Sequence, residues 1–372
     1  MNLILVCMMF LVGMIGSFLE IFKKKSYLII QWLFVFLYVL CILSRVGHSA
    51  TYSDFTTYLR TFVAENNLYF ESGYVTYCDF IRRIFGNSEK IFAIVNACFI
   101  SIIIYSAVRV LNIGIEGNCI KKFGIKKYIF NRQPVNYVSS MLLVFTAYWG
   151  FAFAGEGIRQ GIGITIAILA FAFIMVDKVL VGLVLIIVSI QFHNSMYIVL
   201  PVLLLMLLIR KYPSRKFFLW WIILLIVSDF IINMTPLLNI DFLNNIFNKY
   251  RDSTLVTRFF IYSNTKFEIN YFSTQYIFYH LLAILMLGLD FNNKFVCKSV
   301  FLYYIGLSFG TIFSKTIIVM RIEWVFLPMI FFSIYFFLRD NEQISKNNKF
   351  VFLSGYALLQ VIMALRYLGM YV

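Results

Sequence analysis

The sequence predicts an all-α fold: a polytopic integral membrane helix bundle with about twelve helices, two of them short, and two long loops on its outer side. Composition is the first reason, because 62% of the 372 residues are hydrophobic and 13% are charged, whereas soluble domains are about half apolar and about a quarter charged. The second reason is that apolar runs long enough to cross a bilayer recur along the chain. The third is that the net charge of +15 collects in the loops of one side.

The apolar runs are interpreted as spans because a transmembrane helix needs roughly 17 to 25 residues. We expect spans at 2–22, 27–43, 90–112, 137–154, 158–176, 217–235, 273–289, 298–313, 316–338 and 350–368. The first run has no basic residue before it, so we expect a retained span and not a cleaved signal peptide. A bundle of this kind forms one continuous body, so we expect a single domain, 1–372.

The segment 179–209 is too long for one untilted span and has polar residues from Gln191 to Ser195 at its centre. It forms either one kinked span or two short helices that meet at a polar turn. Loop charge favours two helices, because Lys178 precedes the segment and Arg210 follows it, and basic loops prefer the cytoplasmic side. The polar centre then lies at an outer turn.

Loop charge also orients the whole bundle. With Lys23-Lys24-Lys25 on the cytoplasmic side, nearly all the basic excess is cytoplasmic, and the two long loops, about 44–90 and 236–272, are outside. The excess of basic over acidic residues therefore indicates the topology of the protein in the membrane and not nucleic-acid binding. The sequence shows no internal repeat, which weakens a transporter interpretation.

The first outer loop contains candidate site residues and a helical pattern. The candidates are Asp54, Tyr58 and Glu71. From Tyr74 to Phe85, apolar side chains recur at helical spacing while polar and basic ones fill much of the other face. This pattern is typical of an amphipathic helix in the membrane interface. Such a helix is either a plain surface anchor or a platform from which a lipid-linked substrate reaches the site.

Arg159 opens an apolar helix and shares a helix face with Glu156 and Gln160. A charged residue beside a membrane span usually faces protein or a wet cavity. One interpretation is a structural ion pair between Glu156 and Arg159. The other is a phosphate clamp, because a guanidinium binds phosphate oxygens through two parallel hydrogen bonds.

His193 lies in a polar notch with Gln191, Asn194 and Ser195, at the predicted level of Arg159. A lone histidine is more often structural than catalytic. The polar surroundings make this one a candidate general base, general acid or phosphate ligand.

Three further arginines are expected on the outer side. Arg251 and Arg258 are seven residues apart in the second outer loop, and Arg321 lies about one turn inside a late helix. Together with Arg159 they predict an outward-facing pocket for an anion. The sequence has no GxSxG, HExxH or P-loop motif. A glycan-transfer reaction on the outer side therefore needs a lipid-linked donor.

The order and spacing of these motifs resemble one known family. Asp54 to Tyr58 followed by Glu71-Ser72-Gly73-Tyr74 is similar to the first outer loop of the EpsG-like branch of the bacterial Wzy polysaccharide polymerases. Arg159-Gln160 at a helix start, the later Phe192-His193-Asn194-Ser195, and Arg321 on a late helix fit the same pattern. The resemblance covers roughly residues 50–335.

The resemblance implies a multi-pass enzyme of the bacterial inner membrane with its active site facing the periplasm. Such an enzyme polymerises O-antigen or capsule repeat units, moving a growing glycan from undecaprenyl diphosphate to the non-reducing end of the next lipid-linked unit. The implied partners are that donor and acceptor, membrane lipids, a chain-length regulator and a flippase. No metal, nucleotide cofactor or nucleic acid is implied.

Roles follow for the candidate residues. Arg159, Arg258 and Arg321 neutralise the leaving diphosphate, and either His193 or a carboxylate deprotonates the acceptor hydroxyl. The carboxylate is left open among Asp54, Glu71 and Glu156. We expect Arg251, Gln160, Asn194 and Tyr58 to line the same site. The alternatives are an O-antigen ligase, which shares the donor, and a glycolipid flippase or transporter.

Overall fold

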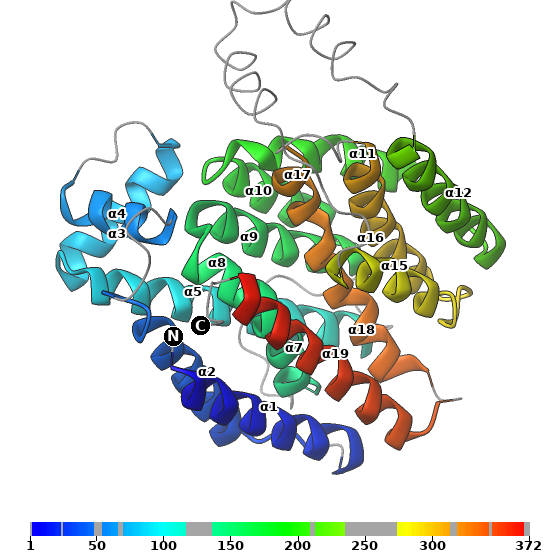
Figure 1. The fold of residues 1–372 in the computed structure, drawn as a ribbon, viewed down its shortest axis with the longest axis horizontal. Helices are drawn as coiled ribbons and strands as arrows, with labels where there is room; N and C mark the ends of the chain where they lie inside the picture. Colours follow the sequence, from blue (N-terminus) through cyan, green and yellow to red (C-terminus); the bar gives the residue numbers. More distant parts are fainter. Residues whose placement is uncertain are drawn as a thin grey trace, which may run out of the picture. The chain divides into compact units, whose positions relative to one another are not determined.

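The fold is described from a computed structural model over residues 2–23, 25–47, 54–65, 70–116, 136–208, 213–234, 274–312, 318–341 and 344–367. Every regular element within these ranges is a helix (Figure 1), which confirms the all-α prediction. The predicted second outer loop, 236–272, falls outside the described residues. The chain forms two compact units: Met1–Leu200 with Leu338–Val372, called unit 1 here, and Pro201–Phe337, called unit 2.

Unit 1 contains most of the helices that the structure describes. They are α1 (Leu3–Lys23), α2 (Leu28–Leu43), α3 (Asp54–Val63), α4 (Ser72–Phe85), α5 (Glu89–Glu116), α7 (Val138–Phe145), the π-helical turn η2 (Thr146–Gly150), α8 (Phe151–Gly155), α9 (Ile158–Met175), α10 (Val179–Ile190), the 3-10 helix η3 (Asn194–Ile198) and α19 (Lys346–Tyr367).

Unit 2 begins within α11 and ends within α18. Its helices are α11 (Val199–Leu208), α12 (Arg215–Met234), α15 (Thr274–Met286), α16 (Lys294–Ile312), α17 (Ile318–Phe326), the 3-10 turn η4 (Leu327–Met329) and α18 (Ile330–Asp340). The single span expected over 316–338 is thus interrupted at η4, where Pro328 lies in the first 3-10 positions. Proline lacks a backbone donor and breaks regular helical hydrogen bonding.

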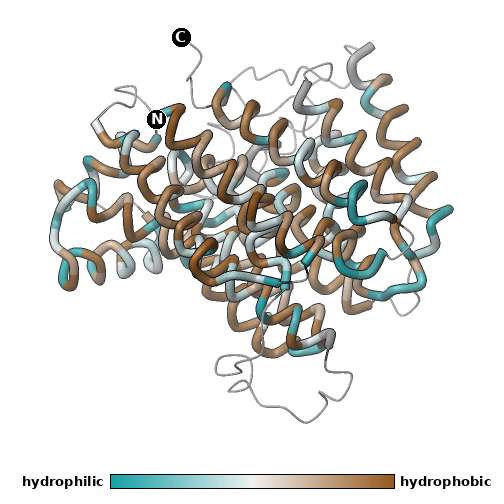
Figure 2. Tube along the Cα trace, turned by 90° about the horizontal axis from the view of Figure 1, so that it is seen from below, coloured by the Kyte–Doolittle hydropathy of each residue, from teal (hydrophilic) through white to brown (hydrophobic). Residues whose placement is uncertain are grey.

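The helices confirm a multi-pass membrane protein. Among the described residues, 6 helices are long and apolar enough to cross a membrane, from Leu3–Lys23 near the N-terminus to Lys346–Arg366. Figure 2 shows hydrophobic residues along the helices and hydrophilic ones mainly at their ends and in the connections. The span Ile158–Met175 is 94% buried, against 39% for Leu3–Lys23. The helix that carries Arg159 is therefore enclosed by protein, as is Val138–Gly155, which is 100% buried.

A turn separates α10 from η3, at the polar residues where the sequence predicted one. Helix α10 ends at Ile190, and η3 packs against both α9 and α10. A Cβ atom at Gly163 of α9 would lie 3.2 Å from the Ser189 carbonyl oxygen and 3.1 Å from Met196 Cγ. Ser189, before the turn, and Met196, after it, therefore both pack against α9 at Gly163. The prediction of two short helices is confirmed, with His193 in the turn.

The segment that was predicted to be the first outer loop folds into two helices, α3 and α4, of which the sequence predicted one. Helix α4 matches the predicted amphipathic segment, and α3 was not predicted. Of the expected apolar stripe, Tyr74 and Ile81 are buried, whereas Phe85 is 50% exposed. Helices α3 and α4 contact each other directly, since Arg82 Nη1 donates to the Phe62 carbonyl at 2.9 Å.

Candidate functional site

One carboxylate, that of Glu71, joins two of the predicted site segments. Its Oε2 forms an ion pair with Arg159 Nη1, and its Oε1 accepts a hydrogen bond from the Asn194 backbone N–H at 3.3 Å. The side chains of Arg159 and Glu71 are 16% and 14% exposed. The structure therefore brings together the start of α4, the start of α9 and the turn after His193.

Local backbone geometry explains why Glu71 can reach both partners. Glu71 stands in the N-cap position of α4 with an extended backbone, yet its side chain makes no capping hydrogen bond to that helix. The next residues fix α4 to the turn, because Ser72 Oγ donates to Gln191 Oε1 at 2.9 Å and the Gly73 amide donates to the Gln191 carbonyl at 3.0 Å. A Cβ at Gly73 would lie 2.7 Å from Gln191 Cβ, so only glycine permits this approach.

Aromatic rings surround the Arg159 guanidinium. Its central carbon lies 4.3 Å from the ring centre of Phe70, 5.5 Å from that of Tyr58 and 6.0 Å from that of Tyr74. Arg159 Nε also donates to the Tyr58 hydroxyl at 3.2 Å. Cation–π contacts of this kind hold an arginine in place and grow stronger when water is excluded. The tyrosine nearest the protein interior is Tyr74, and burial raises its pKa well above the usual range, so it stays protonated.

A second ion pair lies beside the first. Arg45 Nη2 is 2.7 Å from Glu156 Oε2, and Glu156 Oε1 accepts from the Asp54 backbone N–H at 3.1 Å. The interpretation that pairs Glu156 with Arg159 is therefore wrong. Glu156 instead ties the start of α3 to the break between α8 and α9. Burial raises the pKa of Glu156, and the nearby Arg45 charge acts in the opposite direction.

His193 has a structural contact in addition to its predicted role. It is 6% exposed, and its Nδ1 accepts from the Ser195 backbone N–H at 3.1 Å and lies 2.7 Å from Ser195 Oγ. The imidazole thus caps η3, and in the neutral ring the proton resides on Nε2. Nothing in this geometry assigns it a reaction step, so its role as base stays a prediction.

The remaining predicted site residues lie in different parts of the chain, and some of them lie outside the described residues. Gln160 is 9% exposed on α9, and Asp54 begins α3 with an exposed side chain. Arg321 lies in α17 of unit 2, and its side chain is not among those described. Arg251 and Arg258 lie outside the described residues. The pocket of four arginines stays a prediction.

Two residues of the site, Arg45 and Phe70, were not predicted from the sequence. Arg45 follows directly after an apolar run, on the side that loop charge assigns to the outside. A basic residue there departs from the positive-inside pattern, which is a signal that it needs an acidic partner. Phe70 had no comparable signal, since aromatic residues are frequent throughout this chain.

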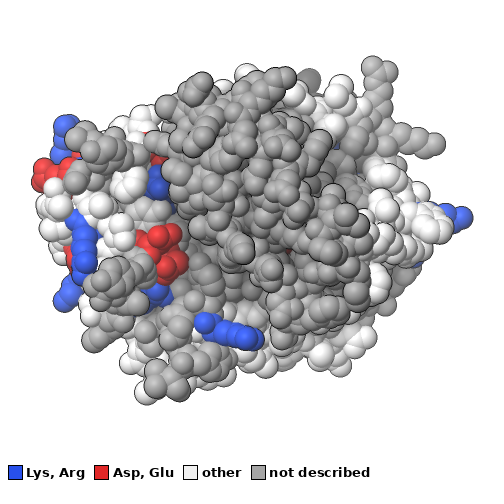
Figure 3. All heavy atoms as spheres, turned by 45° about the horizontal axis from the view of Figure 1, so that its top comes forward, with Lys and Arg blue, Asp and Glu red and all other residues white. Residues whose placement is uncertain are grey.

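These contacts define a class of protein. It is a polytopic membrane protein in which one enclosed span begins with a largely buried arginine that is paired to a carboxylate and bounded by aromatic rings. On the face drawn in Figure 3, charged side chains of both signs gather over the α3–α4 part of unit 1.

The comparisons with known proteins give the family. The EpsG family matches residues 29–371, nearly the whole chain, and the chain therefore belongs to the EpsG family. It is a membrane protein of the polysaccharide-polymerase type, as the resemblance of the motifs predicted. The comparison with curated proteins and the comparison with solved structures each gave no match.

Proposed function

We propose that this protein is a glycosyltransferase that polymerises lipid-linked oligosaccharide repeat units into O-antigen or capsular polysaccharide. The donor is the growing glycan on undecaprenyl diphosphate, and the acceptor is the non-reducing end of the next lipid-linked unit. The reaction takes place on the periplasmic face of the bacterial inner membrane. A flippase that supplies the units and a chain-length regulator are the expected protein partners.

The observation that supports this proposal most strongly is that Arg159 is held in place but still has unused hydrogen-bond donors. Of its five N–H groups, the described partners Tyr58 and Glu71 occupy one each. The other donors meet no described acceptor, and the side chain is 16% exposed. An arginine held by rings and still offering donors is suited to a diphosphate, which provides many acceptor oxygens.

Binding of the donor has a consequence for Glu71. Diphosphate oxygens compete with the Glu71 carboxylate for the same guanidinium. The donor thereby releases the Glu71 carboxylate from its ion pair, and we assign to this carboxylate the deprotonation of the acceptor hydroxyl.

The reaction balances with these groups alone. The acceptor oxygen forms a bond to the anomeric carbon of the donor, and the bond from that carbon to the diphosphate oxygen breaks. The hydroxyl proton passes to Glu71, and the electron pair leaves with undecaprenyl diphosphate. Arg159 stabilises the negative charge that develops on the leaving group.

The test replaces Arg159 in the native host from which the chromosomal gene has been deleted. Arg159→Ala is expected to leave single repeat units in place of long glycan chains, at normal membrane levels of the protein. Arg159→Lys is expected to recover little, because an ammonium lacks the planar fork. The matched control is Arg83→Ala, an exposed arginine on α4, which should keep long chains.

Two results would count against the proposal. Long chains from Arg159→Ala would remove the arginine from the reaction. Loss of even the single repeat unit from the deletion strain would favour the flippase or ligase alternative.

A further inference from the structure

A hydrophobic groove lies between α4 and the first half of α5 in unit 1, outside the proposed reaction site. Its volume is about 580 Å³, and the residues that line it include Phe80 and Phe85 of α4 and Ile94, Val95, Phe99 and Ile102 of α5. Ligand sites of proteins are concave, mostly apolar and roughly 300–1,000 Å³ in volume. The groove therefore has the size and shape of a ligand site.

The sequence of α5 explains why one of its faces remains open. Its lining residues recur at 91, 94, 95, 98, 99 and 102, the spacing of one face of an α-helix. These residues are half-buried or exposed, whereas Phe92 and Ala97 between them are fully buried. Phe92 stacks on Phe62 of α3, and α5 also packs against α9. Helix α5 thus presents one apolar face to protein and a second one to the groove.

The lining determines the chemistry of the ligand. Every described residue that lines the groove is hydrophobic, with Cys98 as the most polar of them. Phe80 and Ile102 are 55% and 58% exposed. A sugar or a phosphate would lose its hydrogen bonds to water there without gaining others. A hydrocarbon chain has no such groups to satisfy and is stabilised by contact with apolar side chains.

The groove lies close to the proposed reaction site. The Tyr77 ring centre is 5.6 Å from that of Phe99 in the groove and 5.9 Å from that of Phe192, the residue before His193. Along α4, the nine residues from Glu71 to Phe80 correspond to about 14 Å at about 1.5 Å per residue. A lipid whose diphosphate is bound by Arg159 therefore has its chain within reach of the groove.

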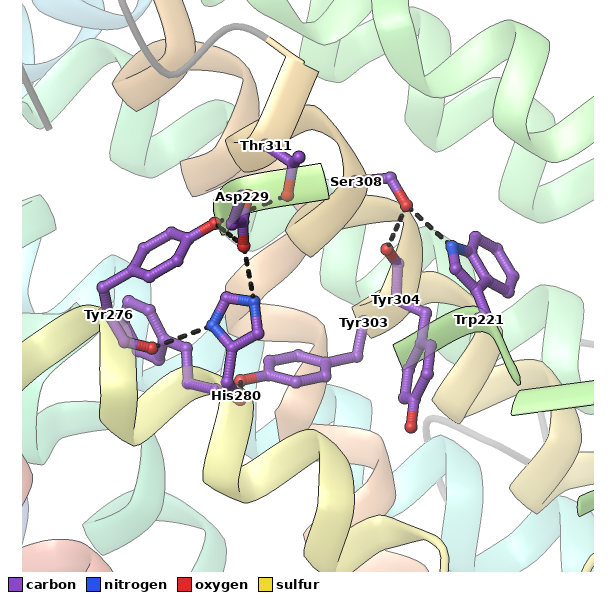
Figure 4. A network of polar contacts seen from close by, with 9 residues as sticks. Trp221, Asp229, Tyr276, His280, Tyr303, Tyr304, Ser308 and Thr311 are labelled. Carbon is purple, nitrogen blue, oxygen red and sulfur yellow. Dashed lines mark hydrogen bonds and ion pairs between the residues drawn. The ribbon is translucent and has the colours of Figure 1, made fainter. Parts of the chain in front are cut away.

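The groove differs from the buried polar network of unit 2 (Figure 4). In that network the Tyr276 hydroxyl donates to Asp229 Oδ2 at 2.8 Å, and Trp221 Nε1 donates to Ser308 Oγ at 3.0 Å. These bonds join α12 to α15 and to α16. Packing within unit 2 thus accounts for the network, whereas the groove is a hollow that leaves large apolar side chains exposed.

We propose that the groove between α4 and α5 binds the polyprenyl chain of the lipid-linked substrate while Arg159 binds its diphosphate. This inference rests on the proposed function for the identity of the lipid. A membrane phospholipid would occupy the groove independently of Arg159. Binding of the polyprenyl chain is instead coupled to the reaction site through α4.

The first test locates the chain directly. The probe is undecaprenyl diphosphate with a photoreactive diazirine in the part of its chain nearest the diphosphate, added to the purified full-length protein in phospholipid nanodiscs. Peptides that contain α4 and the first half of α5 are expected to carry the crosslinks. Unlabelled undecaprenyl diphosphate should remove most of the labelling, and an equal excess of phosphatidylglycerol should not. Equal competition by the two lipids would overturn the proposal.

The second test fills the groove. Val95→Trp is expected to raise the KM for lipid-linked repeat units roughly tenfold, the loss of about two buried methylene groups, with little change in kcat. A substrate with a farnesyl chain should lose a similar factor with the wild type and little more with Val95→Trp. The matched control is Val351→Trp in α19, where the valine is 68% exposed. An unchanged KM for Val95→Trp would contradict the groove.

The outcomes separate this inference from the proposed function. Crosslinks outside α4 and α5 in a wild type that polymerises lipid-linked units would overturn the groove and leave the proposed function intact. Crosslinks within the groove of a wild type that does not polymerise would support the groove and contradict the proposed function.

Discussion

Glu71 and Arg159 form an ion pair across 88 positions of sequence, and the same carboxylate also accepts from the Asn194 backbone. This arrangement connects the start of α4, the start of α9 and the turn that contains His193. Because the two ends of the Glu71 carboxylate contact different segments, the position of α4 is coupled to the arginine that we expect to bind the donor.

Glu71→Gln is expected to lower the polymerisation rate roughly a hundredfold or more, the usual contribution of a general base. Donor affinity should hold or rise, because glutamine competes with the diphosphate for Arg159 less strongly than a carboxylate does. The measurement is the turnover of purified protein with lipid-linked repeat units, together with donor binding. A variant with normal turnover would show that another residue is the base.

Gly73→Ala is expected to destabilise the attachment of α4, because the added methyl would lie 2.7 Å from Gln191 Cβ. We predict a loss of about 1–3 kcal/mol, typical of overpacking, and reduced polymerisation. Thermal unfolding in detergent checks the first effect. The matched control is Gly355→Ala in α19, where nothing lies within 4 Å of the added carbon. Equal behaviour of the two variants would argue against the close contact.

Arg45→Met is expected to destabilise the protein, because it leaves the partly buried Glu156 carboxylate without its cation. Removing one partner of a buried pair costs about 3–5 kcal/mol, and the 20% exposure of the Glu156 side chain places the expected loss at the low end of that range. The double variant Arg45→Met/Glu156→Gln should recover part of it, since no unpaired charge remains. The measurement is a double-mutant cycle on thermal unfolding. Additive losses would mean that the pair is not coupled.

His193→Ala is expected to weaken η3 by about 1 kcal/mol through loss of its cap. Asparagine is a favourable capping residue, so His193→Asn should restore stability and, with Glu71 as the base, most of the polymer length. Chain-length profiles and thermal unfolding of both variants test this. A stable His193→Asn protein that makes only single repeats would transfer the base role to His193.

Much of the fold was predictable because span length, loop charge and apolar periodicity are local signals. The turn at His193 was predicted from charge on both sides of one segment, and α4 from its helical spacing. Helix α3 was missed because its ten residues, DFTTYLRTFV, mix polar and apolar types and sit in a loop. A hydrogen bond from the Asp54 backbone N–H to Glu156 Oε1 holds the start of this helix in position.

The candidate site was predictable only in part. Arg159, Glu71, Tyr58 and Asn194 were all named from the sequence, yet the pairing within the site was not. Glu156 lies on the same predicted helix face as Arg159, but the helix breaks at Glu156 and Gly157. The carboxylate therefore turns toward Arg45.

We propose that Arg159 stabilises a leaving lipid diphosphate during polymerisation. The most direct measurement is the release of undecaprenyl diphosphate by purified protein in liposomes supplied with lipid-linked repeat units. We predict that the wild type releases one diphosphate carrier for each new glycosidic bond and that release by Arg159→Ala is close to background. Polymer formation at the wild-type rate by Arg159→Ala, or no release by the wild type, would contradict it.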